Sequence, residues 1–353
     1  MSHRPTSPTP IPTPTPIVAE QSAQIEHAAM LLDAGQLVAF PTETVYGLGA
    51  DAESPEAVAR IYAAKGRPAN HPVIVHLAAH TDLAYWAAHS PAEAYKLIET
   101  FWPGPLTLIL KRAAHIPAAV SGGQDSVGLR CPSHPVAQAL LEAFSQRRRG
   151  RGGVAAPSAN RFGHVSPTTA QHVRDEFGDA IYVLDGGASD VGIESTILDL
   201  SRGFPVLLRP GQITLEALAE VLGVMPQLPQ LGDMAAPRAS GTLKAHYAPR
   251  TPLVLLPFDA LKSYLNAGEQ VALVARRSQA GEWAAANHVH FVAASENPHD
   301  YARELYGLLR RLDDAQVSRI LIEKLPDTPE WAAVNDRLSR AAAAFDQQSG
   351  NGG

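Results

Sequence analysis

The chain has 353 residues, more than one ordinary domain needs, and its 45% hydrophobic content is ample for buried cores. Its formal net charge of -6 excludes a general electrostatic attraction to nucleic acid, so an RNA contact would need a local basic patch. A single cysteine, Cys131, excludes an internal disulfide framework and a thiolate metal cluster. The sequence has neither an apolar run of membrane-spanning length nor the apolar core of a signal peptide, so we expect a cytoplasmic protein.

Composition divides the chain into five parts. Residues 1–19 include a run of Pro and Thr and are expected to form an extended, disordered tail. An α/β domain is expected over 20–215, followed by a linker over 216–250 that is mostly rich in Pro, Gly, Gln and Ala. Alternating strand and helix patterns predict a smaller, parallel, Rossmann-like domain over 251–345, and residues 346–353 form a second disordered tail.

The first domain is expected to begin with a helix near 20–34, because apolar side chains recur on one of its faces, and a strand at 37–40. A second helix begins at Ser54-Pro55, since serine is a favoured N-cap and proline is favoured at the first helical position. It stops at Gly66, because glycine readily adopts the left-handed conformation that ends helices.

The spacing of Ser90-Pro91-Ala92-Glu93 is that of a capping box and predicts a helix that ends near 101–102. Further strands of this domain are expected at 106–110, 126–130, 154–156, 181–184, 195–200 and 205–208, and helices at 134–145 and 168–177. The second domain is expected to have strands at 252–257, 270–275, 289–293 and 319–324, and helices at 259–266, 298–312 and 330–345. It lacks a Gly-x-Gly-x-x-Gly fingerprint, which argues against a dinucleotide site.

The most informative motif is Lys65-Gly66-Arg67-Pro68, which lies just before the apolar strand 73–77. Two cations in a Gly-Pro turn, ahead of a strand that carries His76, predict a binding site for a polyanion. The alternative is a solvated surface pair, because short basic motifs often occur by chance.

Four other segments combine glycine or proline turns with polar side chains at strand ends, where ligand sites concentrate in α/β sheets. The hydroxyls of 41–49 either bind a ligand or cap a helix. Arg130 ends a strand and either binds a carboxylate or phosphate or forms a surface ion pair. The small residues of 155–160 permit close approach of a ligand, though they also suit an ordinary turn. Ser195 begins a strand, and Arg209 ends one as a further candidate phosphate ligand.

Together these segments resemble the YrdC-type threonylcarbamoyl-AMP synthase family in its long form with a C-terminal extension. The resemblance covers nearly the whole first domain and the linker, whereas beyond residue 250 only the α/β pattern and the length agree. The matching segments are FPTETVYGLGADA at 40–52, KGRP at 65–68, PVIVH at 72–76, FWPGPLTLIL at 101–110, VGLRCPSHP at 127–135, APSAN at 156–160, GIESTILDL at 192–200, LLRPG at 207–211 and HYAP at 246–249.

The resemblance implies a twisted mixed sheet with a large open cavity, and an enzyme that makes threonylcarbamoyl-AMP and pyrophosphate from L-threonine, bicarbonate or CO2, and ATP. The product would feed a downstream tRNA threonylcarbamoyl transferase that modifies tRNA next to the anticodon. The residues that the resemblance assigns to L-threonine are Thr44, His76, Arg130, Ala156 and Ser195. Those that it assigns to ATP are Lys65, Arg67, His71, Ser126, Ser158, Asn160, Ser166, Arg209 and Tyr247.

In this reaction the threonine amine becomes a carbamate, whose oxygen attacks the α-phosphate as pyrophosphate leaves. The transfer needs positioning and charge neutralisation rather than a nucleophilic side chain, so Lys65 and Arg67 are the candidate catalytic residues, with Arg209 beside them. The sequence has no cluster of carboxylates or histidines with metal-ligand spacing. We therefore expect Mg2+ to arrive with ATP, held largely by phosphates and water.

Other interpretations stay open. The loop 147–153 carries four arginines and is either a solvated loop or a weak tRNA contact. An RNA-binding module is an alternative function class, against which the acidic net charge argues. A carbamoyl-transfer maturation factor is another, but proteins of that kind resemble larger assemblies with cysteine-rich zinc modules, and this chain has one cysteine.

Overall fold

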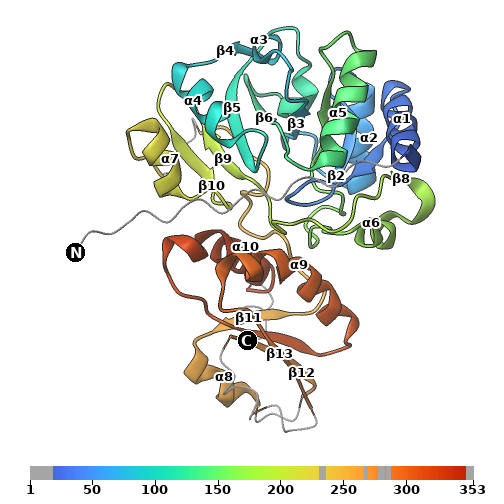
Figure 1. Cartoon of the computed structure of the whole chain (residues 1–353). Coiled ribbons are helices and arrows are strands. Elements are labelled where there is room, and N and C mark those ends of the chain that lie inside the picture. Colours follow the sequence, from blue (N-terminus) through green and yellow to red (C-terminus); the bar gives the residue numbers. More distant parts are fainter. Residues whose placement is uncertain (1–18, 230–235, 266–268, 277–282, 284–287, 347–353) are drawn as a thin grey trace.

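The computed structural model describes residues 19–229, 236–265, 269–276, 283 and 288–346. Two α/β domains lie one above the other, joined by the linker (Figure 1). Except for residues 19 and 346, the two predicted tails lie outside the described residues. Among the residues that are described, no helix is long and apolar enough to cross a membrane.

The first domain is built on a ten-stranded mixed sheet. Its strand order is β10-β9-β5-β6-β3-β7-β2-β1-β8, and β4 pairs with β5 off this path. The pairs β3·β6, β5·β9 and β1·β8 are parallel and the others antiparallel, which confirms the predicted mixed sheet. The strands are β1 (Val38–Phe40), β2 (Gly47–Asp51), β3 (Ile74–Leu77), β4 (Ala87–His89), β5 (Leu106–Arg112), β6 (Ser126–Arg130), β7 (Gly153–Ala155), β8 (Tyr182–Val183), β9 (Thr196–Asp199) and β10 (Val206–Arg209).

Helices of the first domain begin and end where local chemistry favours it. Ser54 caps α2, because its Oγ accepts a hydrogen bond from the Ala57 N–H at 3.1 Å, and Gly66 ends the helix at φ +64°. Both ends of this helix were predicted. The helices are α1 (Ala19–Asp33), α2 (Pro55–Lys65), α3 (Leu83–Trp86), α4 (Ala92–Phe101), α5 (Pro135–Arg147), α6 (Ala170–Phe177) and α7 (Leu215–Leu222).

The predicted capping box at Ser90 is wrong. The N-cap of α4 is Pro91, in an extended conformation and without a side-chain hydrogen bond, so the helix starts too late for Ser90 to cap it. Strands β2 and β4 and helices α3 and α7 are present without having been predicted, and α7 occupies the start of the segment expected to be linker.

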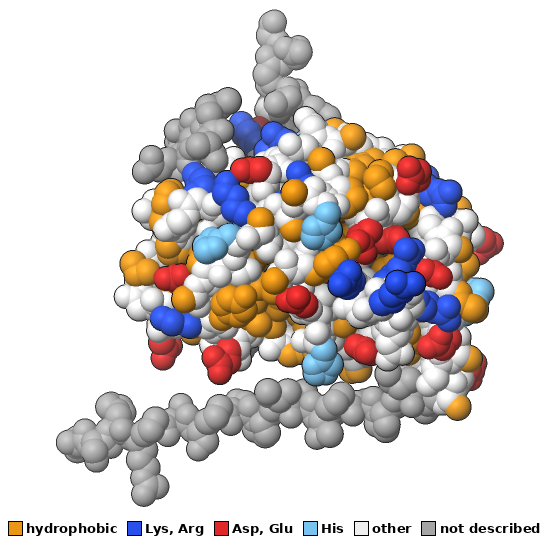
Figure 2. Space-filling model, turned by 90° about the horizontal axis from the view of Figure 1, so that it is seen from above, with side chains coloured by type: hydrophobic (Ala, Val, Ile, Leu, Met, Phe, Trp, Pro, Cys, Tyr) orange, Lys and Arg blue, Asp and Glu red, His pale blue; other side chains and the backbone are white. Residues whose placement is uncertain are grey.

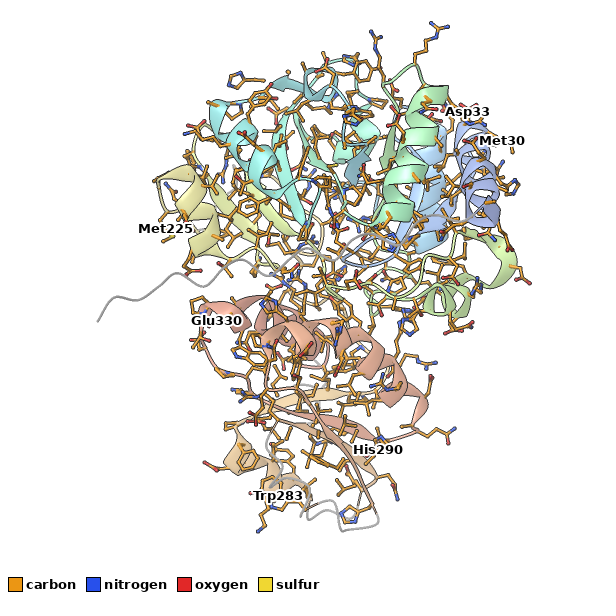
Figure 3. All side chains as sticks on the ribbon, viewed as in Figure 1. Met30, Asp33, Met225, Trp283, His290 and Glu330 are labelled. Atoms are coloured by element: carbon orange, nitrogen blue, oxygen red, sulfur yellow. The ribbon has the colours of Figure 1, made fainter. Side chains whose placement is uncertain are left out.

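The second domain has a four-stranded parallel sheet of order β11-β14-β12-β13, as its alternating pattern predicted. Helices α9 and α10 lie on the side of this sheet that faces the first domain, and α8 lies at the far end (Figure 1). Trp283 packs on Phe258 there, with ring centroids 4.9 Å apart, remote from the first domain (Figure 3). The elements are β11 (Leu253–Leu256), α8 (Phe258–Tyr264), β12 (Val271–Ala275), β13 (Val289–Ala293), α9 (Pro298–Asp314), β14 (Arg319–Glu323) and α10 (Ala332–Ala343).

The two domains share a hydrophobic core. Val45, Val165 and Ile193, all from loops of the first domain, are buried in the same cluster as Leu305 and Leu338 of α9 and α10. The linker contributes Tyr247 to this cluster. The second domain therefore covers the loops at one edge of the first sheet.

Candidate active site

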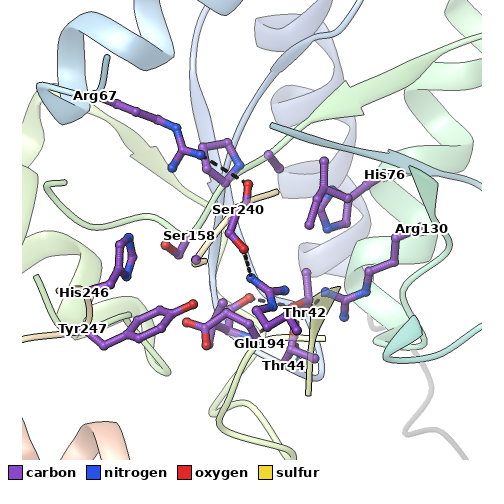
Figure 4. Close-up of a pocket in the computed structure, with 17 residues that line it drawn as sticks. Thr42, Thr44, Arg67, His76, Arg130, Ser158, Glu194, Ser240, His246 and Tyr247 are labelled. Atoms are coloured by element: carbon purple, nitrogen blue, oxygen red, sulfur yellow. Dashed lines mark hydrogen bonds between the residues drawn. The ribbon is translucent and has the colours of Figure 1, made fainter. Parts of the chain in front are cut away.

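A pocket lies where several strand ends of the first sheet meet the linker (Figure 4). Its free volume is about 40 Å³, room for only a few water molecules. The pocket is much smaller than the large open cavity that the resemblance implied, because linker residues 240, 241, 246 and 247 occupy one wall of it. The lining residues are Thr42, Thr44, Val45, Gly47, Arg67, Ile74, His76, Arg130, Ala156, Pro157, Ser158, Glu194, Arg209, Ser240, Gly241, His246 and Tyr247.

Four of the five residues expected to bind L-threonine line this pocket: Thr44, His76, Arg130 and Ala156. Arg130 ends β6, and its Nη1 donates to Thr44 Oγ1 at 2.8 Å. Its Nη2 lies 2.7 Å from a Glu43 carboxylate oxygen, so its charge is balanced by a buried carboxylate. The fifth residue, Ser195, does not line the pocket. Its carbonyl and hydroxyl accept hydrogen bonds from Arg209, and its hydroxyl also bonds to the Thr107 hydroxyl.

His76 offers an uncharged ring to the pocket. Burial, and next the positive charge of Arg130, lower the pKa of His76 to about 3, so the imidazole is neutral at physiological pH. The ring packs edge-on against Phe40 at 6.0 Å between centroids, and its Nδ1 has no hydrogen-bond partner within the described part of the chain. A buried imidazole with a free nitrogen is suited to hydrogen-bond a ligand.

Two further arginines line the pocket. Arg67 Nη2 donates to the Pro72 carbonyl at 2.8 Å and to Ser240 Oγ at 3.2 Å. Arg209 Nη1 donates to the Ser240 carbonyl at 2.9 Å, so both arginines bind one linker residue (Figure 4). Burial lowers the pKa of Arg67 to about 10, which leaves it protonated at neutral pH. Ser158 and Tyr247, also expected on the ATP side, line the pocket as well.

Lys65 does not line the pocket. Its ammonium is buried and donates to the carbonyls of Ser158, at 2.6 Å, and Asn160. Burial, followed by the nearby charge of Arg67, lowers the pKa of Lys65 well below its ordinary value. The Asn160 amide in turn donates to the carbonyls of Arg161 and His164 at 2.7 and 3.0 Å. Both residues thus hold the loop that follows β7 in place.

Three further residues expected to bind ATP also lie outside the pocket lining. Ser126 is buried at the start of β6, and Ser166 donates to Glu194 Oε1 at 2.6 Å. His71 packs edge-on against Phe162 with ring centroids 5.5 Å apart, and burial lowers its pKa. The structure thus brings together eight of the fourteen predicted residues and puts the other six behind or beside them.

Nine pocket residues were not named from the sequence. Glu194 stands within the GIES motif, and Ser240 and Gly241 stand shortly before HYAP, so a signal existed for these three. The assignment of Tyr247 to the ATP side already implied that the linker folds back onto the first domain, and Tyr247 does line the pocket. The remaining residues are Thr42, Val45, Gly47, Ile74, Pro157 and His246.

The linker backbone is strained where it enters the pocket. Tyr247 is buried at φ +61°, an uncommon conformation for a residue other than glycine that is typical of functional sites. Its hydroxyl has no hydrogen-bond partner within the described ranges, and burial raises its pKa, so it stays protonated and able to donate. A Cβ at Gly241 would lie 1.9 Å from this hydroxyl, so glycine is required there.

The arginine-rich loop does not form a free basic patch. Arg147 and Arg148 form ion pairs with acidic side chains at 3.0 and 2.6 Å, and Arg151 lies over the Tyr85 ring at 5.2 Å. The face shown in Figure 2 carries Lys and Arg interspersed with Asp and Glu. Neither feature favours an RNA-binding module.

Fold and pocket together define a two-domain α/β protein whose pocket offers cations and hydroxyls to anionic ligands. A family model described as "Telomere recombination", that of the Sua5, YciO and YrdC proteins, matches residues 30–211. A second, described as "Threonylcarbamoyl-AMP synthase, C-terminal domain", matches residues 213–343. The chain therefore belongs to the threonylcarbamoyl-AMP synthase family, enzymes of the nucleotidyltransferase type, and the resemblance identified from its motifs is confirmed.

Relatives match along both domains. The chain is similar to curated threonylcarbamoyl-AMP synthases of Pyrococcus abyssi and Bacillus subtilis, each 38% identical over 90% of this chain and 94% or 93% of the relative's own length. A solved structure of P. abyssi Sua5 complexed with L-threonine matches with a TM-score of 0.80 and 36% identity, over 91% of this chain and 94% of that one. The predicted fold class is thereby confirmed.

Proposed function

We propose that this enzyme joins L-threonine, bicarbonate or CO2, and ATP into threonylcarbamoyl-AMP, with release of pyrophosphate. The observation that carries the proposal is a single pocket lined by three buried arginines, Arg67, Arg130 and Arg209. The product is a mixed anhydride that a downstream tRNA threonylcarbamoyl transferase consumes.

The wall formed by Thr44, His76 and Arg130 is the proposed threonine side. A guanidinium and a hydroxyl 2.8 Å apart are suited to a carboxylate, and the free Nδ1 of His76 adds a neutral hydrogen-bonding group. The backbone at Ala156 lies beside them, and Ser195 supports the wall from behind. The P. abyssi relative complexed with L-threonine supports this assignment.

Arg67, Arg209, Ser158 and Tyr247 form the proposed ATP side. The carbamate oxygen attacks the α-phosphate, and the two arginines stabilise the charge that develops there and on the leaving pyrophosphate. Lys65, first expected to meet phosphate, acts here by holding the carbonyls of the loop that carries Ser158. No side chain needs to act as a nucleophile.

Mg2+ is the metal that ATP chemistry of this kind uses, and the residues present fit a metal that arrives with the nucleotide. Among the residues that the structure describes, no group of three or more His, Cys, Asp or Glu could hold an ion. Glu194, the carboxylate in the pocket lining, already accepts hydrogen bonds on both oxygens. The metal would thus be held by phosphates and water, and it would add positive charge beside the arginines.

The linker is proposed to act as a lid. ATP does not fit into about 40 Å³, so residues 239–247 must move away before the nucleotide binds. Ser240 offers Arg67 a hydroxyl and Arg209 a carbonyl, the same kind of oxygen contacts that phosphates would make. When the segment closes again over the adenylate, it keeps water from a labile anhydride.

The proposal is tested by incubating the protein with ATP, Mg2+, bicarbonate and L-threonine and by measuring pyrophosphate and the adenylate. Pyrophosphate release that requires threonine is the expected result, and release without threonine dependence would refute the proposal. Arg67→Ala should cost about 2–4 kcal/mol of transition-state stabilisation, roughly 30- to 1000-fold in kcat/KM. Arg60→Ala, which changes an exposed arginine of the preceding helix α2, is the matched control.

A further inference from the structure

One guanidinium of the second domain contacts three segments that build the pocket. Arg337 of α10 is 1% exposed, and its Nε and Nη2 donate to the side chain and the backbone carbonyl of Glu194 at 2.8 and 3.2 Å. Its Nη1 donates to the Pro210 carbonyl at 3.0 Å, and its Cζ lies 5.4 Å from the centre of the Tyr247 ring. Arg337 itself does not line the pocket.

Arg337 contacts both chain segments that position Arg209. Pro210 directly follows Arg209 in the chain, and Glu194 directly precedes Ser195. Arg209 in turn donates to the Ser195 carbonyl and hydroxyl at 3.0 and 3.1 Å. The position of the Arg209 guanidinium therefore depends on two segments that Arg337 holds together.

Arg337 also balances a charge that would oppose ATP. Glu194 lines the pocket close to Tyr247 (Figure 4), where a free carboxylate would repel phosphate. Burial alone would raise its pKa, but the charges of Arg337 and Arg209, with hydrogen bonds from Ser166 and Arg337, lower it to about 2. The ionised carboxylate therefore needs its buried cation. Tyr306 of α9 completes the shell with a hydrogen bond of 2.8 Å to Oε2.

We infer that Arg337 is a positioning residue of the active site, through which the second domain orients Arg209 and Tyr247 and neutralises Glu194 without contacting substrate. This inference rests on the proposed assignment of Arg209 and Tyr247 to the ATP side. It predicts that loss of Arg337 raises the KM for ATP. The affinity for threonine should not change, because Thr44, His76 and Arg130 have no contact with Arg337 in the described structure.

The test compares Arg337→Gln with Arg276→Gln in the full chain. Arg276 makes the same kind of cation–carboxylate contact in the second domain, 3.1 Å from Glu323, but it does not line the pocket, and Glu323 and the Trp331 ring beside it both belong to the second domain. We expect Arg337→Gln to raise the KM for ATP at least tenfold, with the calorimetric Kd for L-threonine within twofold of the parent. Arg276→Gln should change neither constant, and equal constants in the two variants would overturn the inference.

If Arg337→Gln does not fold, a milder variant, Tyr306→Phe, tests the same inference. Tyr306→Phe removes only the hydroxyl that donates to Glu194, and we expect a two- to fivefold higher KM for ATP with an unchanged threonine Kd. An unchanged KM for ATP would then overturn the inference.

A double variant separates this inference from the assignment on which it rests. If Arg337 acts through Arg209, Arg209→Gln combined with Arg337→Gln should lose less than the product of the two single losses. A loss in the double variant equal to the product of the two single losses would overturn the inference about Arg337 but not the assignment of Arg209. An Arg209→Gln enzyme with a normal KM for ATP would overturn the assignment of Arg209 and the inference with it.

Discussion

The arginines of the pocket differ in what balances their charge. Arg67 and Arg209 donate their hydrogen bonds to neutral carbonyl and hydroxyl groups, although the Glu194 carboxylate also acts on the charge of Arg209. Arg130 instead lies 2.7 Å from the Glu43 carboxylate, which leaves that wall nearly neutral overall. This difference fits the proposed assignment, because a nearly neutral group of side chains suits a zwitterionic amino acid and a cationic one suits ATP.

Gly241 is the residue that the linker conformation requires most strictly. Its φ is +75°, and an alanine Cβ there would lie 1.9 Å from the Tyr247 hydroxyl and 3.0 Å from Arg209 Nη1. Because this clash opposes the closed linker, which excludes nucleotide, we expect Gly241→Ala to lower the KM for ATP several-fold, in addition to a backbone cost of about 1 kcal/mol in the free energy of unfolding. Steady-state kinetics and urea unfolding measure the two effects.

Gly203→Ala provides the matched control for that prediction. Gly203 has φ +85° but no atom within 4 Å of its hypothetical Cβ, so it carries the backbone cost without a clash. Its KM for ATP should stay normal. Equal kinetics in the two alanine variants would show that contact with Tyr247 and Arg209 is irrelevant to ATP use.

His76 should make folding stability depend on pH. Burial, then Arg130, lower its folded pKa to about 3, so between pH 6.5 and 3 the unfolded chain binds a proton that the folded chain does not. Stability is therefore fully present above about pH 6.5 and falls as the pH is lowered. From pH 6.5 to 5 this histidine alone should remove about 1.5 kcal/mol. Urea unfolding at the two pH values should show a shallower loss for His76→Gln, with His89→Gln as the exposed control.

Helices and strands with strong local signals could be predicted from the sequence, and elements without them could not. α2 carries a serine N-cap, a proline at its first position and a glycine stop, and it begins and ends as expected. β2 contains Gly47 and Gly49, which weaken a strand pattern. In the fold these glycines are needed, since a Cβ at Gly49 would lie 2.9 Å from the side chains of Phe40 and Val154. Such a long-range contact leaves no local signal.

The same reason limits what the sequence says about the site. His76 and Arg130 could be placed together because β3 and β6 are neighbouring strands that the motifs mark. The motifs pointed to the neighbourhood of Glu194 and Ser240 but not to their contacts, which depend on how α10 and the linker fold back onto the first domain. The carbonyls of Ser158 and Asn160 that surround the Lys65 ammonium could not be foreseen either, because they come from a loop more than 90 residues away in the chain.

The linker segment should compete with ATP. Ser240 Oγ accepts from Arg67 at 3.2 Å and donates to the Pro72 carbonyl at 2.9 Å, so Ser240→Ala weakens the closed state by about 1 kcal/mol. Because closure excludes nucleotide, we expect ATP to bind up to about fivefold more tightly to the variant, while the adenylate is lost to hydrolysis faster. Calorimetry with a non-hydrolysable ATP analogue measures the first effect. Weaker nucleotide binding would mean that Ser240 assists ATP instead of competing with it.

At the scale of the whole molecule, the interface makes the two domains one energetic unit. Loops of the first domain and helices α9 and α10 share one buried hydrophobic cluster, to which the linker adds Tyr247. The buried contact between Glu194 and Arg337 crosses the same boundary. Removing one partner of such a pair costs about 3–5 kcal/mol, because the other charge stays buried without compensation.

The whole chain should therefore unfold in a single transition, which differential scanning calorimetry can test by comparing the calorimetric and van't Hoff enthalpies. A chain that ends at residue 224 keeps α7 with its glycine cap but exposes Val45, Val165 and Ile193. We expect it to melt at a lower temperature, to bind a hydrophobic dye, and to release pyrophosphate at least a hundredfold more slowly, since it lacks Tyr247 and Arg337. Two separate transitions in the whole chain, or normal turnover by the shortened one, would mean that the second domain is an independent appendage. A single transition in the whole chain, together with lost turnover in the shortened chain, would instead make the second domain part of the active site. The cation that balances Glu194, Arg337, comes from helix α10 of that domain.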